Sequence, residues 1–219
     1  MKKRTIIFGS YNTAEHGWTL GAWTLPAAEQ KTNYVDKPGG DGSWDLSTAL
    51  TDGIPRYGNR TLTVPLECSI GTREEREAII NEMVNTLDGL EWEIVLPDRP
   101  DYYLFGRIKV EVNYSDLAHA MVTVTATVEP WLYKAKESVV EIDSTEDGGT
   151  ARIYNGGRKA VVPMLSVEGN IELSVGDASV QLSEGTYKWP IMLLHPGFTT
   201  FNYSGAGSLV LTFREAVLR

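Results

Sequence analysis

The sequence predicts a mainly β protein of two domains with one amphipathic helix. Apolar and polar residues alternate over several stretches of the first half, which is typical of half-buried strands. Only the stretch from Thr72 to Asp88 has helical periodicity, and the second half consists of short apolar runs between Gly, Asn and Pro turns. At 219 residues the chain is long enough for one large or two small domains whose cores need no disulfides.

The first residues suggest an N-terminal hairpin. Its two sides are Ile6–Phe8 and Trp18–Leu25, with a turn-rich segment between them. The stretch from Arg60 to Ile70 then alternates as a half-buried strand does, and Pro65 inside it indicates an edge or a bulge.

The helix has clear signals at both ends. Thr72 and Glu75 are spaced as a capping box, and Gly89 follows the last turn, where a left-handed residue is favoured. One apolar stripe runs along it, formed by Ile79, Ile80, Met83, Val84 and Leu87. We expect this stripe to pack onto a sheet or to close the end of a barrel, rather than to serve as a partner-binding groove.

Three strands are predicted after the helix, at Trp92–Leu96, Tyr102–Val112 and Ala120–Val128. The second and third alternate apolar and polar residues, and threonines fill one side of the third. This pattern predicts an antiparallel meander with one buried face and one solvated face.

The second half reads as a small β-sandwich or jelly roll. We place the domain boundary near Lys134 to Ser138, which gives domains 1–135 and 136–219. The predicted strands are Ala151–Tyr154, Val161–Val167, Ile171–Val175, Ser179–Leu182, Thr186–Trp189, Ile191–Leu194, Thr199–Tyr203 and Leu209–Phe213.

A segment from Tyr34 to Arg60, which we call the arm, is too long for an ordinary connection. Its three glycines, one proline and three aspartates between Asp36 and Asp45 favour turns over a ladder or a helix. Aromatic and aliphatic residues along it indicate that it packs against another surface, and a second copy of the chain is the candidate partner. The candidate oligomer-interface residues are Tyr34, Asp36, Gly39, Gly40, Asp41, Trp44, Asp45, Arg56, Tyr57 and Arg60. For the last three, a strand-entry cluster that pairs with the arm's own aspartates is an equal alternative to an interface anchor.

These segments, in this order, carry a family resemblance. YVDKPGGDGSWDLS (34–47), the helix and WEIVLPDRPDYYLFGRIKV (92–110) resemble the N-terminal domain of distal tail proteins of long-tailed, siphovirus-like bacteriophages or prophages. NGGRKAVVPMLSVEG (155–169), the turn at His195–Gly197 and LVLTFRE (209–215) resemble that family's C-terminal galectin-like sandwich.

The resemblance implies a structural protein of the virion. Such proteins form a hexameric ring at the tip of the tail tube and join it to the baseplate or receptor-binding apparatus. Their N-terminal domains, which have a tail-tube-like split-barrel fold, line the channel, and their sandwiches project outward. The implied partners are other copies of the chain, the tail tube protein, a tail-tip protein and a receptor-binding protein. DNA passes through the channel without specific binding, and assembly takes place in the cytoplasm of the bacterial host.

Composition agrees with this role. A net charge of −9 and a pI near 4.9 disfavour a protein that wraps nucleic acid. No apolar run approaches the roughly 18 residues of a membrane span, and the apolar part of MKKRTIIFG is too short for a secretion signal. The lone Cys68 fits a reducing cytosol and reads as a buried, inert thiol.

No catalytic, cofactor or metal site is predicted. Asp36, Asp41, Asp45 and Asp52 lack the spacing of a calcium-binding EF-hand loop. The three histidines, His16, His119 and His195, are far apart in the sequence.

Carbohydrate binding is the alternative function. It would use Tyr187 and Trp189 for stacking against a host glycan, although core packing is favoured for Trp189. An enzyme acting on cell walls would need paired carboxylates, and no arrangement in the sequence supports a pair.

Overall fold

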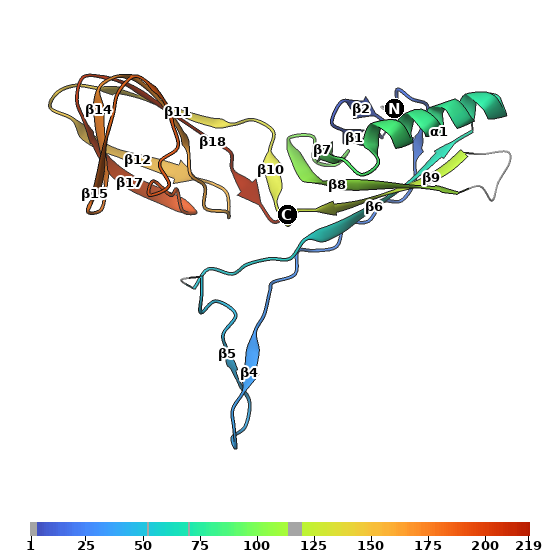
Figure 1. The fold of residues 1–219 in the computed structure, drawn as a ribbon, viewed down its shortest axis with the longest axis horizontal. Coiled ribbons are helices and arrows are strands. Elements are labelled where there is room, and N and C mark those ends of the chain that lie inside the picture. The colour runs from blue at the N-terminus through green and yellow to red at the C-terminus, as the bar shows by residue number, and fades with distance from the viewer. Residues whose placement is uncertain (1–3, 52, 70, 114–119) are drawn as a thin grey trace. The chain divides into compact units, whose positions relative to one another are not determined.

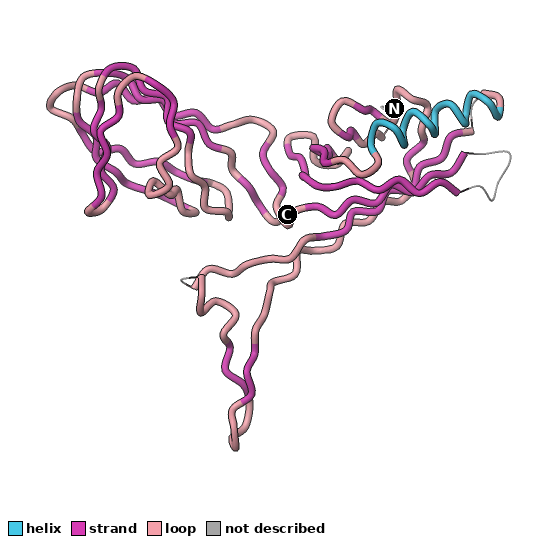
Figure 2. The backbone as a smooth tube through the Cα atoms, in the orientation of Figure 1, coloured by secondary structure: helices cyan, strands magenta, loops and turns pink. Residues whose placement is uncertain are grey.

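The computed structural model describes residues 4–51, 53–69, 71–113 and 120–219. The chain divides into two compact units, one up to Leu132 together with Leu218–Arg219, and the other spanning Tyr133–Val217 (Figure 1). Strands dominate both units, and the described part of the chain holds a single helix, α1 (Arg73–Leu87) (Figure 2). The prediction of a mainly β fold with one amphipathic helix is therefore confirmed.

The first unit is built on one antiparallel sheet. Its strands follow the order β2-β1-β7-β8-β9-β6-β3, so the predicted meander β7-β8-β9 is present. Along β9 the alanines and valines are buried, and Thr123, Thr125 and Thr127 lie on the other face, as expected. The bounds are β1 (Ile7–Phe8), β2 (Tyr11–Asn12), β3 (Thr19–Leu20), β6 (Arg60–Cys68), β7 (Glu91–Val95), β8 (Tyr102–Asn113) and β9 (Ala120–Val128).

The predicted N-terminal hairpin is wrong in its pairing. β1 forms a tight hairpin with β2, whereas the segment after Trp18 pairs with β6, through Thr19 opposite Glu67 and Thr24 opposite Thr63. β1 is flanked by β2 and β7, so neither of its edges is left for Trp18–Leu25. The long ladder of β6 offers that segment an edge instead.

Pro65 is accommodated by an irregularity in the partner segment. β6 lies between β9 and β3, so it is not an edge strand. Between the pairs Leu20–Leu66 and Thr24–Thr63 the partner segment has one residue more than β6, which is the signature of a bulge. Gly21 N–H donates to the Pro65 carbonyl at 2.9 Å within this bulge.

The helix begins as its sequence predicts. Glu75 N–H donates to Thr72 Oγ1 at 3.3 Å, and Thr72 N–H donates to Glu75 Oε2 at 2.7 Å, which completes the capping box. Gly89 has the expected positive φ of 75°. The buried residues of α1 are Ile80, Met83 and Leu87, and the helix packs against β8 and β9 (Figure 1).

The second unit contains two four-stranded antiparallel sheets, β11-β18-β13-β16 and β12-β17-β14-β15, that share one apolar core. Leu165 and Leu211 come from the first sheet, and Ile153, Leu173 and Phe201 from the second. The bounds are β11 (Ser138–Ser144), β12 (Gly149–Asn155), β13 (Met164–Gly169), β14 (Ile171–Val175), β15 (Ala178–Leu182), β16 (Gly185–Tyr187), β17 (Gly197–Ser204) and β18 (Gly207–Phe213). Two short strands, β10 (Leu132–Lys134) and β19 (Ala216–Val217), pair with each other.

Two expectations for this unit are corrected. The charged stretch after Lys134 contains a strand, β11, which pairs along its length with β18. Its side chains are at most half-buried before Ser144, so its apolar signal is weak. Conversely, Ile191–Leu194 is not a strand, because it forms only an isolated bridge between Leu194 and Val161.

Candidate functional site

The arm is a two-stranded excursion from the first unit (Figure 1). Gly58 N–H donates to Glu29 O at 2.9 Å and Lys31 N–H donates to Arg56 O at 2.8 Å, which joins its base to the preceding segment. Further out, β4 (Tyr34–Asp36) pairs with β5 (Ser43–Asp45). The expectation that turn formers would preclude a ladder here is therefore wrong, because between Asp36 and Asp45 the turns are confined to the six residues that separate the two strands.

The conformation of the arm's tip gives structural roles to several of its glycines and aspartates. Gly39 and Gly42 have φ angles of 70° and 76°, which side chains other than glycine rarely adopt, whereas Gly40 has no positive φ. Asp36 accepts a hydrogen bond from Ser43 Oγ at 2.8 Å. Asp45 accepts from Ser47 N–H at 2.9 Å, and the hydrogen bonds from Ser47 lower the pKa of this carboxyl. These two acids therefore stabilise turns, as Asx residues commonly do.

The arm exposes an unusual amount of apolar side chain. Leu50 is 99% exposed, Tyr34 61% and Trp44 51%. The other large exposed apolar residues of the arm are Val35, Leu46 and Ile54. Single exposed apolar residues are ordinary on a soluble protein, but several gathered on one segment indicate a surface that another molecule covers.

Arg56, Tyr57 and Arg60 are separated by the structure rather than gathered into one cluster. Arg56 is exposed, and Tyr57 packs edge-on against Trp131 with ring centroids 5.7 Å apart. Arg60, the first residue of β6, is 6% exposed and donates from Nη1 to the Leu218 carbonyl at 3.5 Å. Within the described ranges, none of the three forms an ion pair with an arm aspartate. Their role at an interface remains a prediction.

In the second unit, Tyr187 and Trp189 are half-buried and pack against the sandwich core. A different aromatic pair is exposed. Tyr154 of β12 and Phe198 of β17 lie opposite each other, each 58% exposed, with ring centroids 4.9 Å apart. The guanidinium carbon of Arg152 lies 3.7 Å from the centroid of the Phe198 ring. Alternation along the predicted strands Ala151–Tyr154 and Thr199–Tyr203 could have placed Tyr154 outward, but Phe198 precedes the predicted strand.

The histidines, the cysteine and the aspartate considered above as possible catalytic or metal-binding residues are described next by their surroundings. His16 stacks on Tyr11 with ring centroids 4.0 Å apart, and its Nδ1 lies 3.2 Å from Glu82 Oε2. Cys68 is buried, and His195 is exposed. Asp52 and His119 lie outside the described residues.

Within the described ranges, no three His, Cys, Asp or Glu side chains are grouped as a metal ion would require. The helix in those ranges is too short and too polar to cross a bilayer.

Comparison with known proteins gives a likeness of fold. No family model matches the sequence, and no curated protein matches it. The crystal structure of the Dit protein of phage SPP1, described as a paradigm of the hub adsorption apparatus in phages that infect Gram-positive bacteria, superposes with a TM-score of 0.70. It is 13% identical and covers 96% of this chain and 98% of its own.

Two structures of the phage p2 baseplate in its activated conformation, with calcium and with strontium, also match. Their TM-scores are 0.42 and 0.43 and their identities 9% and 8%. They cover 97% and 96% of this chain, and 98% of their own chains in both cases.

Proposed function

We propose that this chain is a structural, non-enzymatic component of a phage tail tip. In this role it forms a ring that joins the tail tube to the baseplate or receptor-binding apparatus. The resemblance of its sequence to distal tail proteins implies that the ring is a hexamer. The observation that carries the proposal is the fold shared with a phage hub protein along nearly the whole chain. Because fold alone does not determine function, the proposal also depends on features of this chain.

The arm supports self-assembly. A ring needs heterologous contacts, in which two different patches of the same protein meet. Six large apolar side chains exposed on one segment provide one such patch. Permanent interfaces commonly bury more than about 2,000 Å², and an extended hairpin adds area without enlarging the body of the protein.

Charge supports passage of DNA rather than binding. Each chain carries a net charge of −9, so a ring of several copies repels a polyanion at long range. Under this proposal, the tail tube protein, a tail-tip protein and a receptor-binding protein are the neighbours of the ring.

Light scattering behind a sizing column, at several protein concentrations, tests the proposal. We expect a species near six times 24.2 kDa that appears as a ring in negative-stain electron microscopy. A monomer at every concentration would contradict self-assembly into a ring.

Two variants test the arm. Deletion of Lys37–Trp44 removes its tip, and Leu50→Ser changes a side chain that is 99% exposed and so does not hold the fold together. Both are expected to shift the population toward monomer. Val139→Ser, at an exposed apolar residue of the second unit, is the matched control and is expected to assemble like the native chain. If the deletion unfolds the first unit, the arm belongs to its core.

A second candidate function is glycan binding, favoured by the exposed Tyr154–Phe198 pair beside Arg152. Aromatic faces at a surface stack on apolar sugar faces, and an arginine donates hydrogen bonds to hydroxyls. Titration with host-wall polysaccharides would then give saturable binding that Phe198→Ala abolishes. Absence of binding to every such polysaccharide would exclude this candidate.

A further inference from the structure

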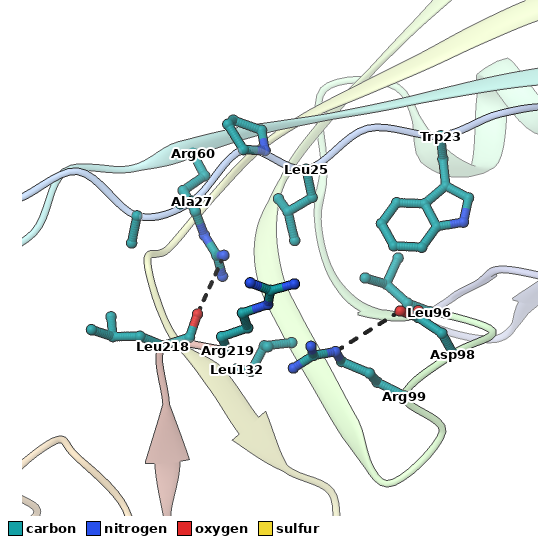
Figure 3. A pocket seen from close by; sticks show the side chains of 12 residues that line it. Trp23, Leu25, Ala27, Arg60, Leu96, Asp98, Arg99, Leu132, Leu218 and Arg219 are labelled. Atoms are coloured by element: carbon teal, nitrogen blue, oxygen red, sulfur yellow. Dashed lines mark hydrogen bonds and ion pairs between the residues drawn. The ribbon is translucent and has the colours of Figure 1, made fainter.

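A cavity of about 410 Å³ lies within the first unit beside the base of the arm (Figure 3). Its apolar lining includes Trp23, Leu25 and Leu96, and its cationic lining is Arg60, Arg99 and Arg219. We call it the Arg60 pocket. Asp98 is its one acidic lining residue, and it lies 3.9 Å from Arg99 Nε. Among the side chains of the lining there are thus three guanidinium groups and one carboxylate, which is an excess of positive charge that the main-chain carboxylate of Arg219 reduces but does not cancel.

Arg60 is the unusual group of this pocket. It is 94% buried, and its Nε and Nη2 have no hydrogen-bond partner among the described residues. Within the described ranges, its one hydrogen bond runs from Nη1 to Leu218 O at 3.5 Å (Figure 3). Burial first, and then the neighbouring charge of Arg99, lower the pKa of Arg60. A buried guanidinium without an acid partner is costly, so proteins normally pair such a group.

The unpaired atoms define the ligand. Nε–H and Nη2–H lie along one edge of the planar guanidinium and point in parallel, which matches the two oxygens of a carboxylate. The pocket also has an apolar part, formed by Trp23, Leu25 and Leu96. This part favours a carboxylate that carries apolar groups with it over a bare inorganic anion.

The arm has that combination of groups. Its tip holds Asp36, Asp41 and Asp45 against one lysine, Lys37, and the exposed aromatic residues Tyr34 and Trp44 flank these acids. Asp36 and Asp45 already accept hydrogen bonds from Ser43 and Ser47. Asp41, exposed in the turn between β4 and β5, is therefore the preferred acid.

We propose that the Arg60 pocket is the receptor for the arm of a second copy of this chain, with the Asp41 carboxylate bound to Nε and Nη2 of Arg60. This inference rests on the proposed self-assembly and adds the patch that the arm meets. One acidic, aromatic patch and one basic, apolar pocket on the same protein are the two unlike surfaces that a ring requires.

The test uses a fluorescent synthetic peptide of residues 33–47, titrated into the full chain and followed by anisotropy. We expect saturable binding that weakens by roughly thirtyfold or more with Arg60→Leu in the chain or Asp41→Asn in the peptide, because each change leaves a hydrogen-bonded ion pair without one partner. Combining both changes should weaken binding little further than either alone. Asp41→Asn keeps the protein untouched, so its result does not depend on the folding of a variant.

Inorganic phosphate and glutamate are added as competitors. Displacement of the peptide only at high concentrations of either is expected. If phosphate binds the native chain and the peptide does not, the pocket is a small-anion site and the proposal is wrong.

Failure of this inference is distinguishable from failure of the proposed function. If the native chain forms a ring, and neither Arg60→Leu nor Asp41→Asn changes the stability of that ring, the pocket is not the receptor for the arm. The proposed ring is then unaffected. A native chain that is monomeric yet binds the peptide with the expected loss in both variants would keep the pocket and overturn the ring.

Discussion

The indole of Trp18 donates a hydrogen bond from Nε1 to the hydroxyl oxygen of Tyr11 at 3.0 Å, and both side chains are buried. Each ring supplies apolar area, and each satisfies the other's single polar group, which makes their burial favourable. His16 stacks on Tyr11, and its Nδ1 contacts Glu82 of α1. The aromatic residues of the N-terminal segment thus pack on one another, and His16 joins the segment to the helix.

Because of Tyr11, the free energy of unfolding is expected to change with pH in the alkaline range. Burial raises the pKa of Tyr11 to about 12, an effect that the hydrogen bond from Trp18 partly opposes. An unfolded tyrosine ionises near pH 10. Between about pH 10 and 12 the unfolded chain releases a proton that the folded chain keeps, so the free energy of unfolding falls as pH rises, by at most about 1.4 kcal/mol per pH unit.

Urea denaturation followed by circular dichroism at several pH values between about 9 and 11 measures this effect. Tyr11→Phe is expected to be less stable than the native chain near pH 9, because Trp18 Nε1 loses its partner, and this difference should shrink as pH rises. Tyr154→Phe, at an exposed tyrosine, is the control and should follow the native chain. Parallel curves for the native chain and Tyr11→Phe would show that Tyr11 ionises equally in both states.

Thr72 sets the start of α1. Thr72→Ala removes the acceptor for Glu75 N–H and is expected to lower the free energy of unfolding by about 1 kcal/mol. Thr72→Ser keeps the hydroxyl and should stay within a few tenths of a kcal/mol of the native value. Amide hydrogen exchange at the first turn of α1 locates the change, and equal protection in both variants would argue against the cap.

Asn155 is a buried polar residue of the second unit, and it forms three hydrogen bonds to main-chain groups. Its Nδ2 donates to the carbonyls of Lys159 and Leu194 at 3.0 and 2.9 Å, and its Oδ1 accepts from Gly157 N–H at 2.9 Å. Asn155→Asp replaces the double donor with an acceptor that faces two carbonyls in a buried site. We expect a loss of about 2–4 kcal/mol in urea denaturation.

Asn202→Asp is the matched control for Asn155→Asp. Asn202 is exposed and its Oδ1 accepts from Thr150 Oγ1, a bond that aspartate can also accept. This variant should unfold with the native chain. Similar losses in the two variants would mean that the burial of Asn155 is not what matters.

Trp189 distinguishes core packing from glycan binding. Because it packs against the sandwich core, Trp189→Ala is expected to lower the free energy of unfolding by about 2–4 kcal/mol. Tyr154→Ala, at an exposed ring, should cost less than about 1 kcal/mol. A stable Trp189→Ala protein that loses glycan binding would instead restore the stacking role predicted for Tyr187 and Trp189.

Contacts between residues close together in the chain could be predicted from the sequence, and contacts between distant residues could not. The capping box of Thr72 and Glu75 joins residues three apart, so the sequence predicts it directly. Alternation identified β6, β8 and β9, because each buries one face. The same pattern failed for β11, whose side chains are half-buried or exposed before Ser144, and for Ile191–Leu194, where only one residue forms a bridge.

The features of the candidate site also fall into those that the sequence could predict and those that it could not. The glycines and aspartates of the arm marked its turns, and its apolar residues marked it as a segment that contacts a partner. The burial of Arg60 and its unpaired edge had no signal in the sequence, because the lining of its pocket comes from five separate stretches of the chain. Tyr154 and Phe198 also meet only through the pairing of β12 with β17.

The sequence by itself determined the mainly β fold, the helix and its cap, and the turns of the arm, because these depend on residues that are near neighbours in the chain. Tertiary structure decided that Trp18–Leu25 pairs with β6, that β11 pairs with β18, and that Arg60 is buried beside Leu218. Strand pairing and burial depend on contacts between segments that are distant in the chain. The main-chain hydrogen-bonding groups at a strand edge do not select a partner by sequence, so the fold as a whole determines which segment pairs there.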